Sequence, residues 1–160
     1  MGKAGVGLIK GVDVEEIVNR LDSYYCYNLV VMHFSHALRN RLEGQAAYLL
    51  NDELEENAEQ SLEAARKLAD RIGELGGEVT ADPTLFVERS PLGEFSLPAS
   101  NYEVGVILGF VLERIRMIIE EYAGFLERIR GRDEISHLLV LDLLKEQVAR
   151  EAEIEAALTN

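Results

Sequence analysis

The sequence predicts an all-α fold, a four-helix bundle in which two helical hairpins are joined by one long crossover loop. Two observations carry this prediction. Apolar residues recur at three- and four-residue steps in four long segments, which is the spacing of one helix face. All three prolines fall in one non-periodic segment, residues 76–100, between the second and third of these segments. A loop of this length fits a bundle in which the chain must travel from one end to the other.

Length and composition predict a single domain. The chain has 160 residues, and we expect residues 1–12 to be a flexible, Gly-rich N-terminal segment and residues 13–160 to form the bundle. The only cysteine, Cys26, excludes an internal disulfide, and we expect it to be a small buried apolar residue. Since no signal peptide and no bilayer-spanning apolar stretch is visible, the sequence predicts a cytoplasmic protein.

The charge balance argues against two classes of partner. The net charge is −13, and an acidic surface repels both phosphate backbones and anionic lipids. We therefore expect no nucleic-acid partner and no membrane partner. An acidic surface suits cations, and it also keeps a protein soluble.

The first helix is predicted from Asp13 to about Arg41, with Asp13 and Glu16 as a capping box. Its inner face is predicted to comprise Val14, Ile17, Val18, Leu21, Tyr25, Asn28, Met32 and Ser35. Further apolar or aromatic residues lie off this face, namely Tyr24, Tyr27, Val30, Val31 and Phe34. A helix that is apolar nearly all round is normally buried by something else. We therefore expect a homo-oligomer, either a dimer or a larger shell.

The second helix is predicted from Ala46 to Leu75, where Gly76 and Gly77 stop it. Its buried stripe is predicted to be Leu50, Leu54, Ala58, Ser61, Ala65, Leu68, Ile72 and Leu75. Its outer face carries a stripe of carboxylates, namely Asp52, Glu55, Glu56, Glu59 and Glu63.

The third and fourth helices form the second hairpin. The third is predicted to start at the N-cap Asn101, with residues 131–133 as the turn that follows it. The fourth is predicted from Glu134 to Leu158. Its inward residues are predicted to be Leu138, Leu141, Leu144 and Val148.

Several short motifs occur in an order typical of one superfamily. They are Tyr24-Tyr25-Cys26-Tyr27 with Met32-His33, Arg71-Ile72-Gly73-Glu74-Leu75-Gly76-Gly77, Asp82-Pro83, Leu97-Pro98 and Gly131-Arg132-Asp133. In these motifs the chain resembles the ferritin-like superfamily over residues 14–158, most strongly the archaeal-type Dps-like proteins and the bacterioferritins. The resemblance implies a ferritin-like bundle.

The resemblance also implies where a di-iron site of the family would fall. That site takes one Glu from the first and third helices and a Glu-x-x-His pair from the second and fourth. The second-helix pair falls on Ser61 and Ala64, and the fourth-helix pair falls on Gln147 and Arg150.

The other two positions depend on which register is chosen. The first-helix position falls on Asn28, or upstream toward Arg20 if the tyrosine cluster sets the register. The third-helix position falls on Ile115, or on Glu113 if the preceding loop is two residues longer.

These residues predict that the usual ferroxidase centre is absent. The only histidines are His33, His36 and His137, so no Glu-x-x-His pair exists in the chain. Amides and small side chains cannot replace carboxylate charge, and a guanidinium repels ferrous ions. We therefore expect no catalytic residue and no resident cofactor, and we expect Arg150 to fill the former metal cavity beside Glu113 or Glu63, or else to reach solvent.

Two other groups are weaker candidates for metal binding. His33 and His36 are neighbours on one helix face, but two histidines make an incomplete ligand set. Glu59 and Glu63 belong to the carboxylate stripe, which is most simply a solvated face. The favoured function is a ferritin-like oligomeric protein with a structural or assembly role. The alternative is an iron-binding, iron-storage or oxidative-stress protein that uses a rearranged or lumenal acidic site.

Overall fold

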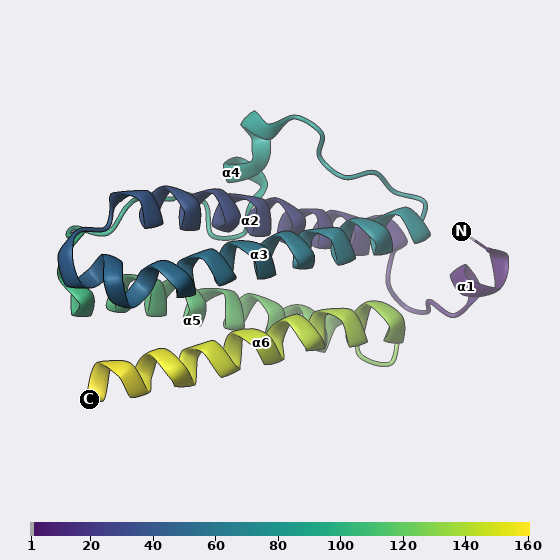
Figure 1. Ribbon diagram of the computed structural model, residues 1–160. Coiled ribbons are helices and arrows are strands. Elements are labelled where there is room, and N and C mark those ends of the chain that lie inside the picture. Colours follow the sequence, from purple (N-terminus) through teal and green to yellow (C-terminus); the bar gives the residue numbers. More distant parts are fainter. Residues whose placement is uncertain (1) are drawn as a thin grey trace.

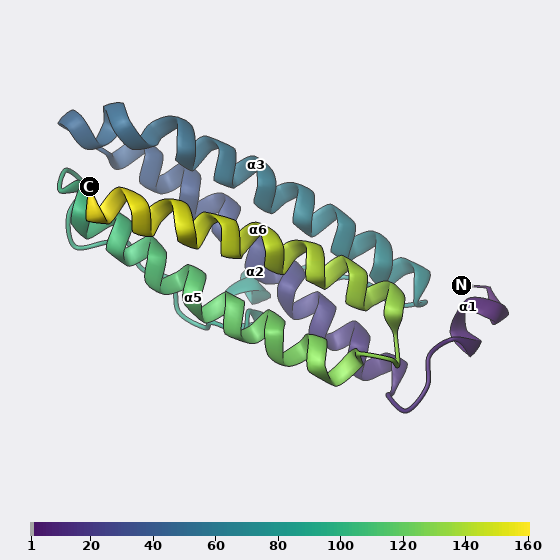
Figure 2. The same cartoon turned by 90° about the horizontal axis from the view of Figure 1, so that it is seen from below.

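The computed structural model describes residues 2–160, apart from the side chains of Lys3 and Val6. Four long helices lie alongside one another as a bundle (Figures 1 and 2). They are α2 (Val14–Arg41), α3 (Gly44–Glu74), α5 (Val104–Ile129) and α6 (Glu134–Thr159). Helices α2 and α3 form one hairpin and α5 and α6 the other, which confirms the predicted fold.

Three short elements lie outside the bundle. Helix α1 (Lys3–Gly7) falls in the segment that the sequence predicts to be flexible, and Ile9 and Val12 after it pack against the core. The crossover contains the 3-10 helix η1 (Pro83–Leu85) and the single-turn helix α4 (Phe86–Arg89). No helix in the described part of the chain is long and apolar enough to cross a membrane.

Side chains at the helix ends differ in detail from the prediction. Asp13 caps α2 by accepting a hydrogen bond from the Glu15 amide at 3.1 Å. The predicted capping box is wrong, because the Glu16 carboxylate instead accepts two bonds from the Arg128 guanidinium at 2.9 and 3.1 Å. Helix α5 starts at Val104 rather than at Asn101, because the Ser100 hydroxyl accepts the free amides that precede it.

The end of α3 depends on two glycines. Gly76 adopts a φ of +82°, a conformation that favours glycine, and the Gly77 amide closes the helix on the Ile72 carbonyl at 2.9 Å. A Cβ on Gly77 would lie only 2.6 Å from Cγ1 of Val18 on α2. A larger residue at Gly77 would therefore push the two helices of this hairpin apart.

The interior consists of two apolar clusters. One surrounds Tyr24, Leu68 and Tyr122 near the end of the bundle where α3 and α5 end. The other surrounds Leu50 and Ile107 at the opposite end. The whole predicted stripe of α3 is buried, as is Cys26, whose pKa burial raises.

The crossover covers part of the first hairpin and corrects one expectation. Tyr24 and Tyr27, predicted to lie off the inner face of α2, are buried within the chain itself. Phe95 of the crossover packs on Tyr27 and Phe34, with ring centroids 6.1 and 6.3 Å apart. Tyr27 is therefore covered by the crossover, and Tyr24 by Tyr122 and Phe125 of α5, without a second subunit.

The inner face of α6 also differs from the prediction. Leu138 and Val148 are 61% and 47% exposed, whereas Val140 and Leu143 are buried. Leucines occur on every side of this helix, so their spacing does not decide which side faces inward. The buried Ser136 bonds Arg71 of α3 on the side of α6 that faces inward.

A buried ion pair lies beside this hydrogen bond, at the α5–α6 turn. The Arg71 guanidinium on α3 bonds the Asp133 carboxylate at 3.0 Å and donates to the Ser136 hydroxyl at 2.9 Å. The side chains of Arg71 and Asp133 are only 5% and 2% exposed. The Asp133 carboxylate also caps α6 by accepting the Ser136 amide at 3.1 Å, so this pair fixes the rotation of α6 against α3.

We expect Asp133→Asn to lower the free energy of unfolding by about 3–5 kcal/mol, because it removes the buried counter-charge of Arg71 and leaves only the exposed Glu74 carboxylate, 2.9 Å away. Urea denaturation measures this change. Arg128→Gln is the matched control, since it removes an exposed pair with Glu16 and should leave the unfolding midpoint unchanged. Equal midpoints for Asp133→Asn and the parent protein would contradict the role assigned to the Arg71–Asp133 pair.

Candidate functional site

A layer of polar side chains separates the two apolar clusters at the centre of the bundle. Asn28 and Ser35 come from α2, Asn57 and Ser61 from α3, and all four are buried. Spacings of seven and four residues place each pair on one helix face. Gln147 and Arg150 reach the same region from α6, where a spacing of three residues aligns them.

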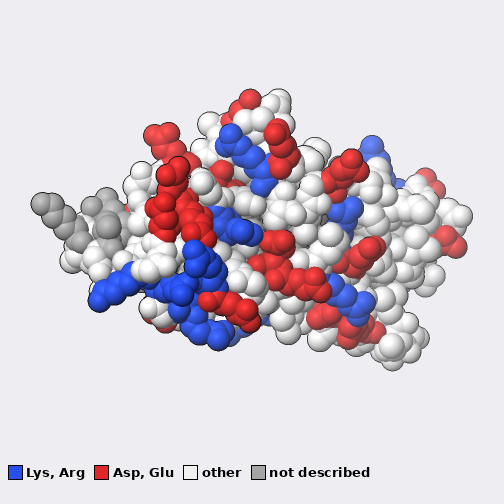
Figure 3. All heavy atoms as spheres, turned by 180° about the vertical axis from the view of Figure 1, so that it is seen from behind, with Lys and Arg blue, Asp and Glu red and all other residues white. Residues whose placement is uncertain are grey.

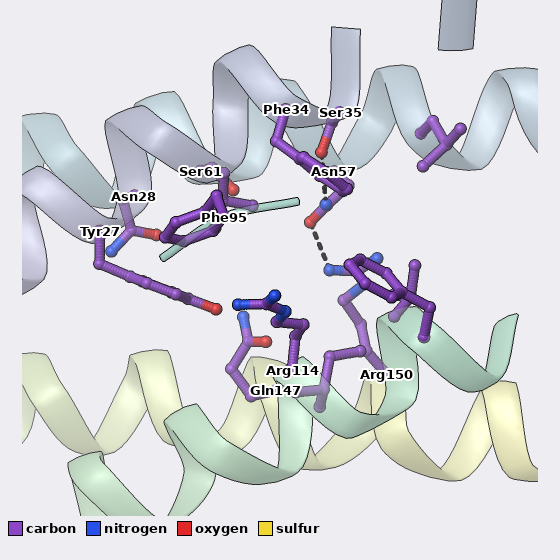
Figure 4. A pocket seen from close by; sticks show the side chains of 15 residues that line it. Tyr27, Asn28, Phe34, Ser35, Asn57, Ser61, Phe95, Arg114, Gln147 and Arg150 are labelled. Atoms are coloured by element: carbon purple, nitrogen blue, oxygen red, sulfur yellow. Dashed lines mark hydrogen bonds between the residues drawn. The ribbon is translucent and has the colours of Figure 1, made fainter. Parts of the chain in front are cut away.

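This layer borders a cavity of about 40 Å³, which is room for a few water molecules. Polar and apolar side chains from α2, α3, α5, α6 and the crossover line the cavity (Figure 4). The lining residues are Tyr27, Asn28, Val31, Phe34, Ser35, Leu54, Asn57, Ser61, Phe95, Phe110, Val111, Arg114, Ile115, Gln147 and Arg150.

Hydrogen bonds hold the two asparagines of the layer. Asn57 donates to the Ser35 hydroxyl at 2.8 Å and accepts a bond from the Arg150 guanidinium. Asn28 donates to the Tyr24 backbone carbonyl at 2.8 Å and to the Tyr122 hydroxyl at 3.3 Å. Both amides are therefore bonded, as a buried amide requires.

Arg150 carries the only cationic side chain of the layer itself. Its side chain is 13% exposed, and burial lowers its pKa while the Glu53 carboxylate acts in the opposite direction. The nearest approach to that carboxylate is 3.9 Å, and Glu53 is 42% exposed. Arg150 thus fills the centre of the bundle with a charge that is only partly balanced.

The predicted partners of Arg150 are wrong. Glu113 is exposed and points away from the cavity, since Ile115 is the residue of α5 that faces it. Glu63 is exposed on the outer face of α3, where it lies 3.8 Å from Arg66. Glu113 and Ile115 are two residues apart, a step that turns the side chain about the helix axis by more than half a circle. Both cannot face the cavity, so the alternative that placed Glu113 at the third-helix position is wrong.

The predicted di-iron positions that do not depend on the tyrosine cluster or on a longer loop lie close together. Asn28, Ser61, Gln147 and Arg150 line the central cavity, and Ala64 lines a small adjoining space with three of them. The alternative first-helix position, Arg20, lies on the surface beside Glu121 at 3.4 Å.

The other metal candidates lie on the surface. His33, His36 and Glu59 are exposed, and they do not meet at the central cavity. Within residues 2–160, leaving aside the two undescribed side chains, no three His, Cys, Asp or Glu side chains come close enough to share a metal ion.

Two functional-site residues were missed by sequence reasoning. Asn57 occupies the buried stripe of α3 four residues before Ser61, a spacing that could have identified it. Arg114 stacks its guanidinium over Phe95 and Phe110, 5.2 and 5.1 Å from the ring centroids. The Phe95 contact comes from the crossover, so no periodicity within α5 indicates it.

The buried tyrosines predict how stability depends on pH. Burial raises the pKa of Tyr24, Tyr27 and Tyr122 above the ordinary value of about 10. The unfolded chain therefore releases these protons first, and stability should fall as the pH rises above about 10. The urea midpoint measured between about pH 8 and pH 11 should decrease, and it should decrease less steeply in Tyr122→Phe. Identical pH slopes for the two proteins would contradict this assignment.

Comparison with known proteins agrees with this architecture. A family model described as the ferritin-like domain matches residues 15–160. A DNA protection during starvation protein of Pyrococcus furiosus is 26% identical over 93% of this chain and 80% of its own length.

Solved structures show the same arrangement. A dodecameric thioferritin, the bacterioferritin-related protein of Bacteroides fragilis, superposes with a TM-score of 0.88 at 24% identity, covering 99% of this chain and 94% of its own. The Dps of Staphylococcus aureus superposes with a TM-score of 0.81 at 16% identity, covering 90% and 95%. Because the model of the ferritin-like domain matches nearly the whole bundle, this chain belongs to the ferritin-like family.

Proposed function

We propose that this chain is a ferritin-like subunit that lacks the di-iron ferroxidase centre and has a structural or assembly role. The observation that carries the proposal is the Arg150 guanidinium in the polar layer, bonded to the Asn57 amide. The proposal concerns the centre of the bundle, where the family's chemistry takes place.

The side chains at that centre do not fit a pair of iron ions. Two ferrous ions need several carboxylates to bridge and neutralise them. The corresponding positions hold two amides, a hydroxyl, a methyl group, an isoleucine and a guanidinium. They supply no negative charge, and the guanidinium repels a cation that approaches it.

A homo-oligomer is the second part of the proposal. The Bacteroides fragilis relative is described as dodecameric. In this chain, Leu138 and Val148 of α6 and Tyr48 and Leu49 of α3 are exposed. Exposed large apolar side chains of this kind support burial against a second copy.

The alternative function is iron storage or protection against oxidative stress, which the name of the Pyrococcus furiosus relative favours. The carboxylate stripe of α3 supports it, because Asp52, Glu55, Glu56, Glu59 and Glu63 are all exposed. Figure 3 draws the molecule from the side opposite to α3, and on that face basic side chains lie between the acidic ones. A cytoplasmic location and the lack of a nucleic-acid partner remain predictions, the latter from the charge of −13.

Anaerobic titration with ferrous ions, followed by desalting and metal analysis, tests the proposal. We expect well under about two tightly bound irons per chain, since the family's site takes two irons on carboxylates that are missing here. A variant with the five stripe carboxylates changed to amides is measured in parallel.

The variant separates the two functions. About two tightly bound irons in both proteins would overturn the loss of the centre. Iron that binds the parent chain and is lost in the stripe variant would favour the storage function instead.

Sedimentation at micromolar concentration tests assembly. We expect a species larger than a monomer, and we expect Leu138→Glu to shift it toward smaller species because a charge would then be buried at the contact. Glu113→Gln serves as a surface control that should sediment like the parent protein. A parent protein that sediments as a monomer would refute the oligomer.

A further inference from the structure

The central cavity has an unusual charge balance. Of the 15 residues that line it, Arg114 and Arg150 are cationic and none is acidic. Arg150 is largely buried and its nearest carboxylate, Glu53, lies 3.9 Å away, whereas Arg114 is only partly buried. Desolvation disfavours the charged form of such a group unless a counter-charge meets it. A bound negative charge would relieve that cost.

Several hydrogen-bond donors point into the same space. Figure 4 shows the Tyr27 hydroxyl, the Arg114 guanidinium and the Gln147 amide directed toward the middle of the cavity. The dashed hydrogen bonds among the residues drawn join Asn57 to Ser35 and to Arg150. No dashed bond joins Tyr27, Arg114 and Gln147 to one another. Both guanidinium groups lie near enough to Tyr27 to offset part of the pKa rise that burial gives it.

Arg150 and Arg114 differ in the number of carboxylates near their guanidinium groups. Outside the cavity, a separate groove beside Arg150 is lined by Glu53, Glu56, Glu146 and Glu153. Arg114 donates to the Glu94 backbone carbonyl at 2.9 Å and faces two aromatic rings, with no ion pair inside the described chain. Arg114 is therefore the stronger anchor for an anion, and Arg150 is the second cation that lines the cavity.

We propose that this cavity is a binding site for a small monovalent carboxylate. Its oxygens accept hydrogen bonds from Arg114, Gln147 and the Tyr27 hydroxyl, within reach of the charge of Arg150. Its short apolar end rests against Phe34 and Phe95. A cavity of about 40 Å³ limits the ligand to a few non-hydrogen atoms, the size of acetate.

This site extends the proposed function and does not need iron. The family's centre surrounds cations with negative ligands, whereas the only charged residues that line the present cavity are two arginines. The same bundle would thus bind an anion where the family binds iron cations.

NMR titration of the complete protein with sodium acetate tests the site. Ionic strength is held constant with sodium chloride, and acetamide and nitrate are titrated separately. We expect saturable shifts with a dissociation constant of about 1 mM and contacts between the acetate methyl protons and the ring protons of Phe34 and Phe95. Acetamide, which has the same shape without the charge, should give no saturable shift.

Variants identify the anchors. Arg114→Met and Arg150→Met should each weaken acetate binding by about tenfold or more, since each removes a charge-assisted interaction. Arg116→Met is the matched control on the same helix, because Arg116 pairs with Glu151 and Glu155 at the surface. It should bind acetate as the parent does.

The titration of the parent protein decides the proposal even if a variant fails to fold. No saturable response up to about 100 mM acetate, an equal response to acetamide, or binding of nitrate alone would overturn it. If acetate fails while ferrous ions also fail to bind, the carboxylate site is wrong and the proposed loss of the iron centre stands.

Discussion

A guanidinium group at the centre of the bundle determines what its neighbours can be. Arg150 gives up most of its hydration there, and it recovers hydrogen bonding from the Asn57 amide, which in turn engages Ser35. Carboxylates are displaced to the outer surface, where Glu53 reaches it only at 3.9 Å. The proposed lack of a di-iron centre rests on this buried charge and on the amide and hydroxyl side chains around it.

Two further contacts, one with α6 and one with the crossover, concern the walls of the central cavity. The Arg71–Asp133 pair holds the rotation of α6 against α3, so that Val140, Leu143 and Arg150 face inward. The crossover is held by the Asp22 carboxylate, which accepts hydrogen bonds from the Thr80 amide and hydroxyl at 2.8 and 2.6 Å. This anchoring lets the crossover place Phe95 over the cavity, where it closes one wall and stacks on Arg114.

The helices could be predicted from the sequence because their apolar stripes are periodic. The stripe of α3 is unambiguous and every predicted member is buried, whereas α6 carries leucines on all sides. Of its predicted face, Leu141 and Leu144 pack against the core, but Leu138 and Val148 are exposed. Counting residues brought Asn28, Ser61, Gln147 and Arg150 to one cavity. The partner of Arg150 and the covering of Tyr27 are contacts between distant segments, and no spacing within one helix contains them.

Membership of the ferritin-like family describes the scaffold, and the side chains at its centre decide the chemistry. The most direct test of the account is diffraction from crystals exposed anaerobically to ferrous ions, with data collected at the iron absorption edge. The account predicts no anomalous peak in the polar layer and an Arg150 guanidinium still bonded to Asn57. Two strong peaks between Asn28, Ser61 and Gln147, with Arg150 displaced, would contradict it.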